Sequence, residues 1–207
     1  MKIRIALVAG MVGSLFATSA FADEGVSAST GVEKKFKLGA QLELIPVGNI
    51  AIKAGPIDGN TDTSTAYGVG MNFDYDLTPN ISVGAAPRII FGIASDKEKG
   101  DVDTTEEIDL RARVVAHFPV ADKLQVYGFA APGFAISTNA SADKDLTNPT
   151  GFLIAFGGGA TYDVSPSMFL SAEAGYQLSF QSVTEGNSTG DWNTKFLSVG
   201  FGAGTRF

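Results

Sequence analysis

The sequence predicts an all-β fold, an eight-stranded antiparallel up-and-down transmembrane β-barrel, and three observations support this prediction. In segment after segment, large apolar residues alternate with small or polar ones, which is the period of a strand whose two faces meet different surroundings. Tight turns alternate with longer polar connections along the chain. Beyond residue 22, no segment of comparable length has the periodicity of a helix, and no apolar run reaches the ~20 residues of a transmembrane helix.

The composition excludes several classes of protein. Of the 207 residues, 44% are hydrophobic and 18% are charged, which argues against disorder. The chain has no cysteine, so disulfides, thiol catalysis and cysteine-ligated metals are excluded. Its formal net charge of −7 argues against a nucleic-acid partner.

The first 22 residues have the features of a secretory signal peptide. Lys2 and Arg4 precede an apolar stretch, and Ala20, Phe21 and Ala22 form the small-x-small pattern of a cleavage site. The apolar stretch is too short for the alternative, a transmembrane helix. The predicted organisation is a signal peptide over 1–22 and one β-barrel domain over 23–207.

Eight segments carry the alternation and predict the strands in order. In 67–77, for example, Tyr67, Met71 and Phe73 fall on one face, with glycine, asparagine and aspartate on the other. The predicted strands, each with an apolar or small residue at every second position, are 36–44, 67–77, 81–93, 108–118, 124–136, 152–164, 168–180 and 197–207.

Two of these strands are irregular. Pro87 and Pro132 lie mid-strand, where each removes a ladder hydrogen bond and predicts a bulge or a local distortion. The strand 124–136 also places Tyr127 and Phe129 on the face opposite its apolar positions.

The connections between the predicted strands are of two kinds. Three are tight, at 77–81, 119–123 and 164–168, and proline suits such turns. The other four are longer and polar, at about 47–64, 94–105, 137–150 and 182–193. An up-and-down meander therefore has its short turns and both chain ends at one end, and its long loops at the other.

The bulk of the apolar face decides which way it points. An eight-stranded barrel has an interior just wide enough for side chains to fill, and this apolar face would overfill it. The opposite face is rich in glycine, serine and alanine, which suits a narrow interior better than a water-exposed surface. The apolar face is therefore expected to meet lipid, where a closed barrel satisfies its backbone hydrogen bonds.

Aromatic residues on the apolar face gather at both ends of the strands, as in the two interfacial girdles of membrane barrels. Next to the long connections are Tyr67, Phe91, Phe134, Phe152 and Phe180, and next to the short turns or chain ends are Phe36, Tyr75, Phe118, Tyr162 and Phe207.

With these features the chain resembles the small eight-stranded outer-membrane barrels of Gram-negative bacteria, the OmpA-like and OmpX-like proteins. The resemblance extends from about residue 36 to 207 and is carried by MNFDYDLTPNISVG, IAFGGGATYDVSPSMFLSAEAGYQ and FLSVGFGAGTRF. It implies a location in the outer membrane, in contact with outer-membrane lipid and lipopolysaccharide. It also implies that the last strand, ending in Phe207, is the signal for the barrel-assembly machinery.

No catalytic, cofactor-binding or metal-binding residue is assigned. His117, the only histidine, has no serine near it in sequence and lies on the interior phase, unsuited to a lipid-modifying enzyme. The acidic segment 101–107 lacks the central glycine and the twelfth-position glutamate of a calcium loop. The glycines of 157–159 and 200–204 lie within strands with no helix following, so they are expected to make room inside the barrel rather than to bind phosphate.

Charged residues on the interior phase distinguish the remaining functions. In so narrow a lumen, opposite charges are expected to pair and block it, because unpaired charge is costly. The sequence therefore predicts a non-enzymatic barrel with a structural or surface-interaction role through four extracellular loops, whose ligand is unknown; the alternative is a narrow porin-like channel for small solutes. The interior charges are Glu107, Asp109, Arg111 and Arg113 on the fourth strand, and Asp74, Arg88 and Glu173 on others.

Overall fold

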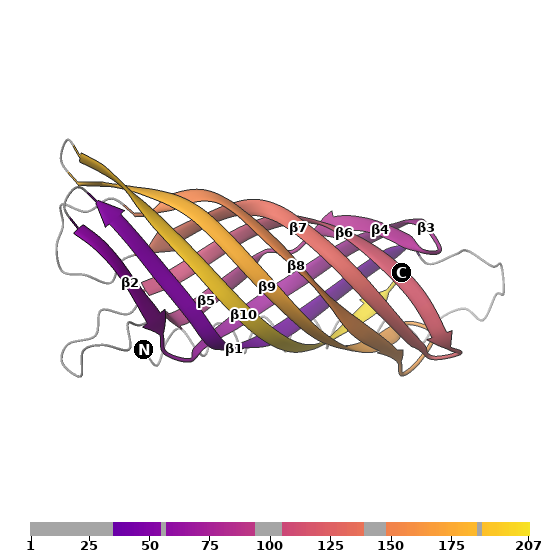
Figure 1. Ribbon diagram of the computed structural model, residues 1–207. Coiled ribbons are helices and arrows are strands. Elements are labelled where there is room, and N and C mark those ends of the chain that lie inside the picture. The colour runs from indigo at the N-terminus through magenta and orange to yellow at the C-terminus, as the bar shows by residue number, and fades with distance from the viewer. Residues whose placement is uncertain (1–34, 55–56, 94–104, 139–147, 186–187) are drawn as a thin grey trace, which may run out of the picture.

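The computed structural model describes residues 35–54, 57–93, 105–138, 148–185 and 188–207, which fold into one closed antiparallel sheet (Figure 1). These residues contain no helix, and accordingly none long and apolar enough to cross a membrane. The strands are β1 (Phe36–Ala54), β2 (Ile57–Thr63), β3 (Ala66–Thr78), β4 (Ile81–Ala85), β5 (Arg88–Ile93), β6 (Thr105–Ala121), β7 (Leu124–Thr138), β8 (Thr150–Asp163), β9 (Met168–Glu185) and β10 (Ser188–Arg206).

Strand β1 closes the sheet into a barrel because it pairs with β10 on one side and with β2 and β3 on the other. Strands β2 and β3 follow one another along β1, and β4 and β5 together fill the place between β3 and β6. The ring therefore has eight positions in up-and-down order. This confirms the predicted eight-stranded antiparallel barrel.

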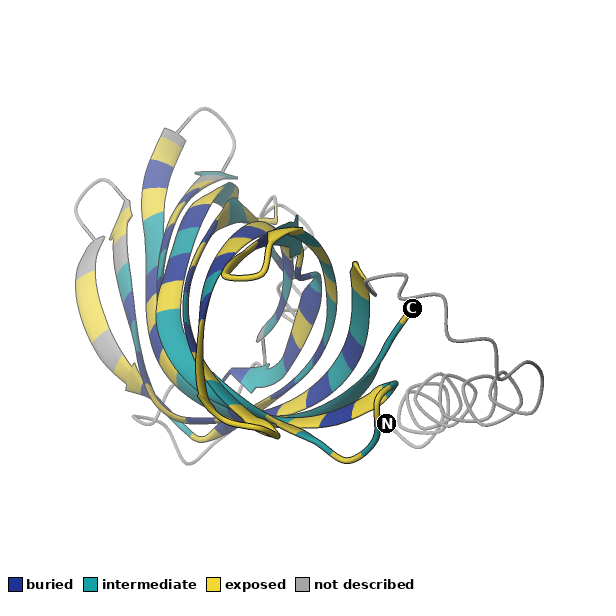
Figure 2. Ribbon diagram, turned by 90° about the vertical axis from the view of Figure 1, so that its right-hand side faces the viewer, coloured by how far each residue is buried: buried dark blue, intermediate teal, exposed yellow. Residues whose placement is uncertain are grey.

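The two faces of the sheet point as the alternation predicts. Burial alternates along the strands in the end-on view (Figure 2). In β6, Leu110 and Val114 are 56% and 51% exposed, whereas Asp109 between outward neighbours is fully buried. Bulky apolar side chains thus cover the outside and the lumen holds the polar ones, as a bilayer requires.

Cross-strand pairing brings together several aromatic residues of each predicted girdle. Near the loop end, Phe152 lies opposite both Phe134 and Phe180. At the other end, Phe36 lies opposite Tyr75, with ring centroids 5.0 Å apart, and it stacks on Phe207 at 6.0 Å.

Two of the four predicted long loops are instead strands. The segment 47–64 belongs largely to β1 and β2, and 182–193 largely to β9 and β10. Outside a bilayer a strand needs no apolar outer face, so these extensions lack the alternation that predicts strands. Most of the other two loops, at 94–104 and 139–147, lies outside the described residues. The three tight turns are confirmed between β3 and β4, β6 and β7, and β8 and β9.

Both mid-strand prolines interrupt pairing beside the same point of β6. The expected strand 81–93 is divided at Ala86 and Pro87 into β4 and β5. Pro132 keeps its pairing with β8 but interrupts the ladder between β7 and β6. Ala112 of β6 lies beside both interruptions: its partner Ala85 is the last residue of β4, and on the other side it lies between the pairs Arg111–Gly133 and Val114–Ala130.

Ile93 corrects the prediction for the same strand. The alternation places it on the outer face, yet it is 2% exposed and lies in the interior. The cause is a bulge between Ile90 and Ile93, where Gly92 has a φ of 76°. An extra residue in the ladder reverses the phase of the residues that come after it in the strand.

Glycines of the segment 157–159 make room for aromatic side chains inside the barrel, as expected. A Cβ on Gly159 would lie 2.6 Å from the Tyr127 hydroxyl oxygen, and one on Gly157 would lie 2.9 Å from the Phe129 ring. Tyr127 and Phe129 are both buried, as their phase predicts.

Candidate functional site

The most highly organised group of polar side chains fills the lumen around Arg88. The guanidinium of Arg88 lies 2.6 Å from a Glu43 carboxylate oxygen and 2.7 Å from one of Asp109, and it donates a further hydrogen bond to Gln177. All three charged side chains are at most 3% exposed. Arg111 adds a second positive charge, 4.0 Å from Glu43, and donates to the backbone carbonyl of Ala86. Buried charge is tolerated here because it is paired and hydrogen-bonded.

Glu107 is fully buried but does not pair with an arginine within hydrogen-bonding distance. Its carboxylate accepts hydrogen bonds from the side-chain amides of Gln177 and Gln181, each at 2.9 Å. The hydroxyls of Ser137 and Thr194 donate to it at 3.2 and 3.3 Å. Strands β6, β7, β9 and β10 are thereby joined through one carboxylate.

A second charged group lies closer to the turn end. Arg113 stands 3.6 Å from Asp74 and 3.3 Å from Glu173, and Tyr127 donates to Glu173 at 3.0 Å. The Arg113 guanidinium also lies 5.1 Å from the centre of the Phe129 ring, a cation–π distance. Packed beside it is an apolar cluster of Val115, Tyr127, Phe129, Ala131 and Ala155.

Toward the loop end, apolar side chains occupy the interior. This cluster is made of Ile45, Ile50, Ala66, Ile90, Ile93 and Phe196, with Trp192 packed against it. The lumen between the loop end and Arg113 is thus occupied by paired charges and apolar groups.

The sequence identified most of the lumen charges but only some of their pairings. Asp109 does pair with Arg88, and Arg113 with Asp74 and Glu173. Reasoning from sequence missed Glu43, Gln177 and Gln181. The signal was present, since Glu43 lies between Leu42 and Leu44, and both glutamines lie on the interior phase of 168–180 or its continuation.

His117 does have a serine partner, which sequence distance concealed. Its Nε2 lies 2.7 Å from Ser82 Oγ, across 35 positions of sequence. A catalytic triad needs a carboxylate on the other imidazole nitrogen, but Asp76 accepts from Ser82 instead and His117 Nδ1 has no partner. Ser82 is also fully buried. The arrangement does not present an accessible nucleophile.

The described residues contain no group of three or more histidine, cysteine, aspartate or glutamate residues that could hold a metal ion. Residues 101–104 of the acidic segment lie outside the described residues, whereas Glu106 and Glu107 belong to β6.

Comparison with known proteins agrees with this architecture. The chain is similar in structure to the outer membrane protein OprG from Pseudomonas aeruginosa, with a TM-score of 0.61 and 12% sequence identity. The alignment covers 84% of this chain and 96% of OprG. It is also similar in structure to Neisserial surface protein A, with a TM-score of 0.51 and 13% sequence identity, and the alignment covers 83% of this chain and 97% of that protein. At such identities the likeness concerns the fold alone, and no curated protein sequence matches the chain significantly. Residues 9–207 match the outer membrane protein beta-barrel domain, and the chain therefore belongs to this family of bacterial outer-membrane barrels.

Proposed function

We propose that the protein is a non-enzymatic outer-membrane barrel that acts through its extracellular face, with a lumen that does not conduct. The network of Arg88, Glu43 and Asp109 carries this proposal. These three side chains are fully or almost fully buried and joined at 2.6 to 2.7 Å, and eight strands leave room for little else. Opening a passage would require separating buried, paired charges, which is costly.

Activity at the surface would then depend on what projects beyond the membrane. In barrels of this class the short turns face the periplasm and the longer connections face the outside. The candidate contact surfaces are the β1–β2 and β9–β10 hairpins and the segments 94–104 and 139–147. Outer-membrane lipid and lipopolysaccharide surround the barrel in this proposal, and the extracellular ligand is of unknown chemistry.

Conductance in planar bilayers tests the closed lumen. The purified wild-type barrel should give no stable single-channel openings. Reproducible openings whose ion selectivity changes in Arg111→Ala would instead favour the second candidate, a narrow channel for small solutes. That alternative draws support from a cavity among the polar residues at the turn end.

A pull-down from intact cells tests the surface role. Replacing 94–104 and 139–147 with Ser/Gly linkers of equal length should remove partners that the wild-type barrel captures. The matched control replaces residues 165–167 in the tight β8–β9 turn with a Ser/Gly linker of equal length. This variant should capture the same partners as the wild type. Equal capture by all three proteins would contradict a role for the extracellular segments.

Export should remove residues 1–22. The small-x-small pattern at Ala20 to Ala22 predicts cleavage after Ala22. The intact mass of protein isolated from outer membranes should match a chain that begins at Asp23. A mass that includes residues 1–22 would refute the signal peptide.

Phe207 should matter for assembly into the membrane more than for the stability of the folded barrel. It is 61% exposed on the outer face and exchanges two backbone hydrogen bonds of 3.0 Å with Phe36. Because Phe207→Ala keeps that backbone and removes the ring, it should lower the yield of inserted barrel and raise periplasmic degradation. Phe201→Ala, an equally outward position of β10 at 66% exposure, is the control, and an equal loss in both variants would contradict a special role for Phe207.

A further inference from the structure

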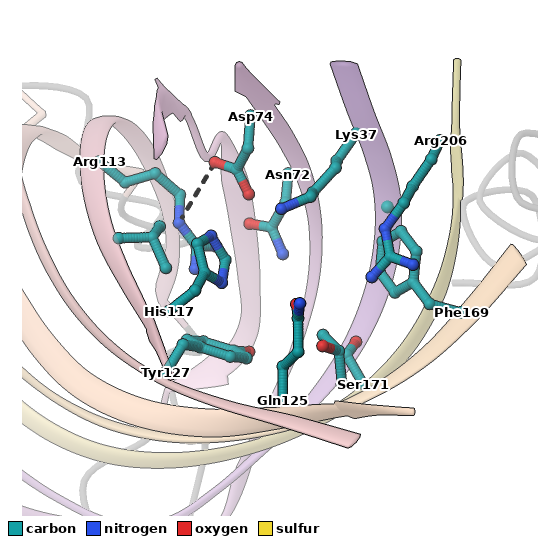
Figure 3. A pocket seen from close by; sticks show the side chains of 13 residues that line it. Lys37, Asn72, Asp74, Arg113, His117, Gln125, Tyr127, Phe169, Ser171 and Arg206 are labelled. Atoms are coloured by element: carbon teal, nitrogen blue, oxygen red, sulfur yellow. Dashed lines mark ion pairs between the residues drawn. The ribbon is translucent and has the colours of Figure 1, made fainter. Parts of the chain in front are cut away.

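The turn end of the lumen contains a cavity of about 30 Å³ that the charged layers leave unfilled (Figure 3). One wall comes from β6 to β9 and includes His117, Gln125, Thr161 and Ser171, and the facing wall includes Asn72 and Asp74 of β3. Lys37 and Arg206, near the ends of β1 and β10, also line it. On the measure used for buried water, this volume holds about two water molecules.

Unpartnered polar atoms concentrate around this cavity. Of the eight buried side-chain nitrogen and oxygen atoms without a hydrogen-bond partner among the described residues, five belong to side chains that line it. Two of them, Asp74 Oδ1 and Arg113 Nε, form an ion pair with each other at 3.6 Å. The other three, on His117, Gln125 and Thr161, have no partner in the described part of the chain. Buried polar atoms in folded proteins are nearly always satisfied, by protein or by ordered water. The unpartnered atoms around the cavity therefore indicate that it binds a small polar molecule.

The hydrogen bonds around Ser82 define what His117 offers to this molecule. The single hydroxyl proton of Ser82 is donated to Asp76, which also accepts from Lys37 at 2.8 Å. His117 Nε2 must then donate its own proton to Ser82 Oγ, 2.7 Å away. In the neutral imidazole this leaves Nδ1 as an acceptor, and Nδ1 is unpartnered on a side chain that is 5% exposed.

The other orphaned atoms call for a molecule that both donates and accepts. Gln125 Oε1 is an acceptor, and the Thr161 hydroxyl can both donate and accept. Water meets this combination and the size of the cavity, whereas a larger solute does not.

Access to the cavity differs between its two ends. Toward the outside it is bounded by Arg113 and by Val115 and Tyr127, which belong to the apolar cluster around Phe129. Toward the turn end, the side chains of Lys37 and Arg206 are partly exposed, and Figure 3 shows both projecting into the space from neighbouring strands.

We propose that the periplasmic end of the lumen is a binding site for a small cluster of water molecules, held by His117 Nδ1, Gln125 Oε1 and Thr161 Oγ1. This hydrated vestibule exchanges with the periplasm and is closed at its outer end by Arg113 and the apolar cluster. The hydrated vestibule rests on the proposed closed lumen only at its outer boundary. An experiment can therefore refute either proposal without refuting the other.

The absence of cysteine from the chain allows an accessibility test with single cysteines. Thr161→Cys lies in the vestibule, and Ser137→Cys lies in the fully buried group around Glu107. With the folded barrel in nanodiscs, a methanethiosulfonate ethylammonium reagent should modify Cys at 161 at least about tenfold faster than at 137, because thiol reactivity follows access. Folding of each variant is verified by heat-modifiable mobility.

Each result of this experiment has a definite meaning. Negligible labelling at 161 in a folded barrel would refute the hydrated vestibule and leave the closed lumen untouched. Fast labelling at both positions would refute the closed outer end and, with it, the proposed closed lumen.

The unmodified protein supplies an independent readout, because His117 is its only histidine. In ¹⁵N-labelled barrel without a histidine tag, His117 should be the Nε2–H tautomer, with the Nδ1 shift of a hydrogen-bonded acceptor and cross-peaks from its ring protons to water. The side-chain amide of Gln181, which is buried and donates to Glu107, should show no water cross-peak. A free Nδ1 without water contacts would overturn the proposal even if the cysteine variants failed to fold.

Discussion

Val114→Arg should lower the free energy of unfolding in bilayers by about 2–4 kcal/mol, the cost of an arginine on the lipid face near the midplane of a barrel. Val114 lies in the middle of β6, points outward and is 51% exposed to the surroundings of the barrel. Its neighbours across the sheet are Val83 and Ala130, which offer no partner for a guanidinium. Equilibrium urea unfolding in phospholipid vesicles would measure the loss.

The matched control places the same side chain in the lumen. Asn72→Arg adds an arginine beside the turn-end cavity, where Asp74 also lies, and its cost should be clearly smaller. Val115 is a poorer control, since it packs in an apolar cluster with Tyr127 and Phe129, and a larger residue there would overpack the interior. Equal costs for Val114→Arg and Asn72→Arg would mean that the two faces of the sheet have been assigned wrongly.

The sequence predicted the strands and their faces wherever lipid lies on one side. Within the bilayer the outer face must be apolar and the lumen small or polar, so segments such as 67–77 carry an unmistakable period of two. Beyond the membrane the outer face of a strand meets water and need not be apolar, although Ile50 and Phe196 on the inner face are buried. In β1 a register shift between Leu44 and Val47 also changes the phase, so the period of two disappears. This is why the sequence pattern predicts loops where β2 and the outer halves of β1, β9 and β10 lie.

The face of the sheet on which a side chain lies can be predicted from the local sequence, but the partner of that side chain cannot. The alternation alone places Asp109 and Arg113 inside the barrel. Which charge meets which depends on the register and tilt of eight strands, which no local pattern records. Glu107 illustrates the consequence: Arg88 already binds Glu43 and Asp109, so Glu107 takes amide and hydroxyl donors instead.

The contact between Ser82 and His117 was missed for the same reason. Ser82 pairs with Val115, so register brings it next to the strand that carries His117. Prediction from sequence could exclude a local serine but not one delivered by a neighbouring strand. In this geometry Asp76 is bound to the serine rather than to the imidazole, which differs from the arrangement of a catalytic triad.

Arg88→Met should be the most damaging single substitution in the lumen, lowering the free energy of unfolding by about 3–5 kcal/mol, because it leaves Glu43 and Asp109 buried without their common partner. Arg206→Met is the matched control, since its pair with Asp163 is partly exposed and such pairs contribute about 1 kcal/mol or less. Adding Glu43→Gln and Asp109→Asn to Arg88→Met should recover much of the loss, because the stranded charges are then removed as well. Urea unfolding in vesicles would test all three proteins. If the triple variant were no more stable than Arg88→Met, packing by the long arginine side chain, rather than charge compensation, would be what the lumen requires at this position.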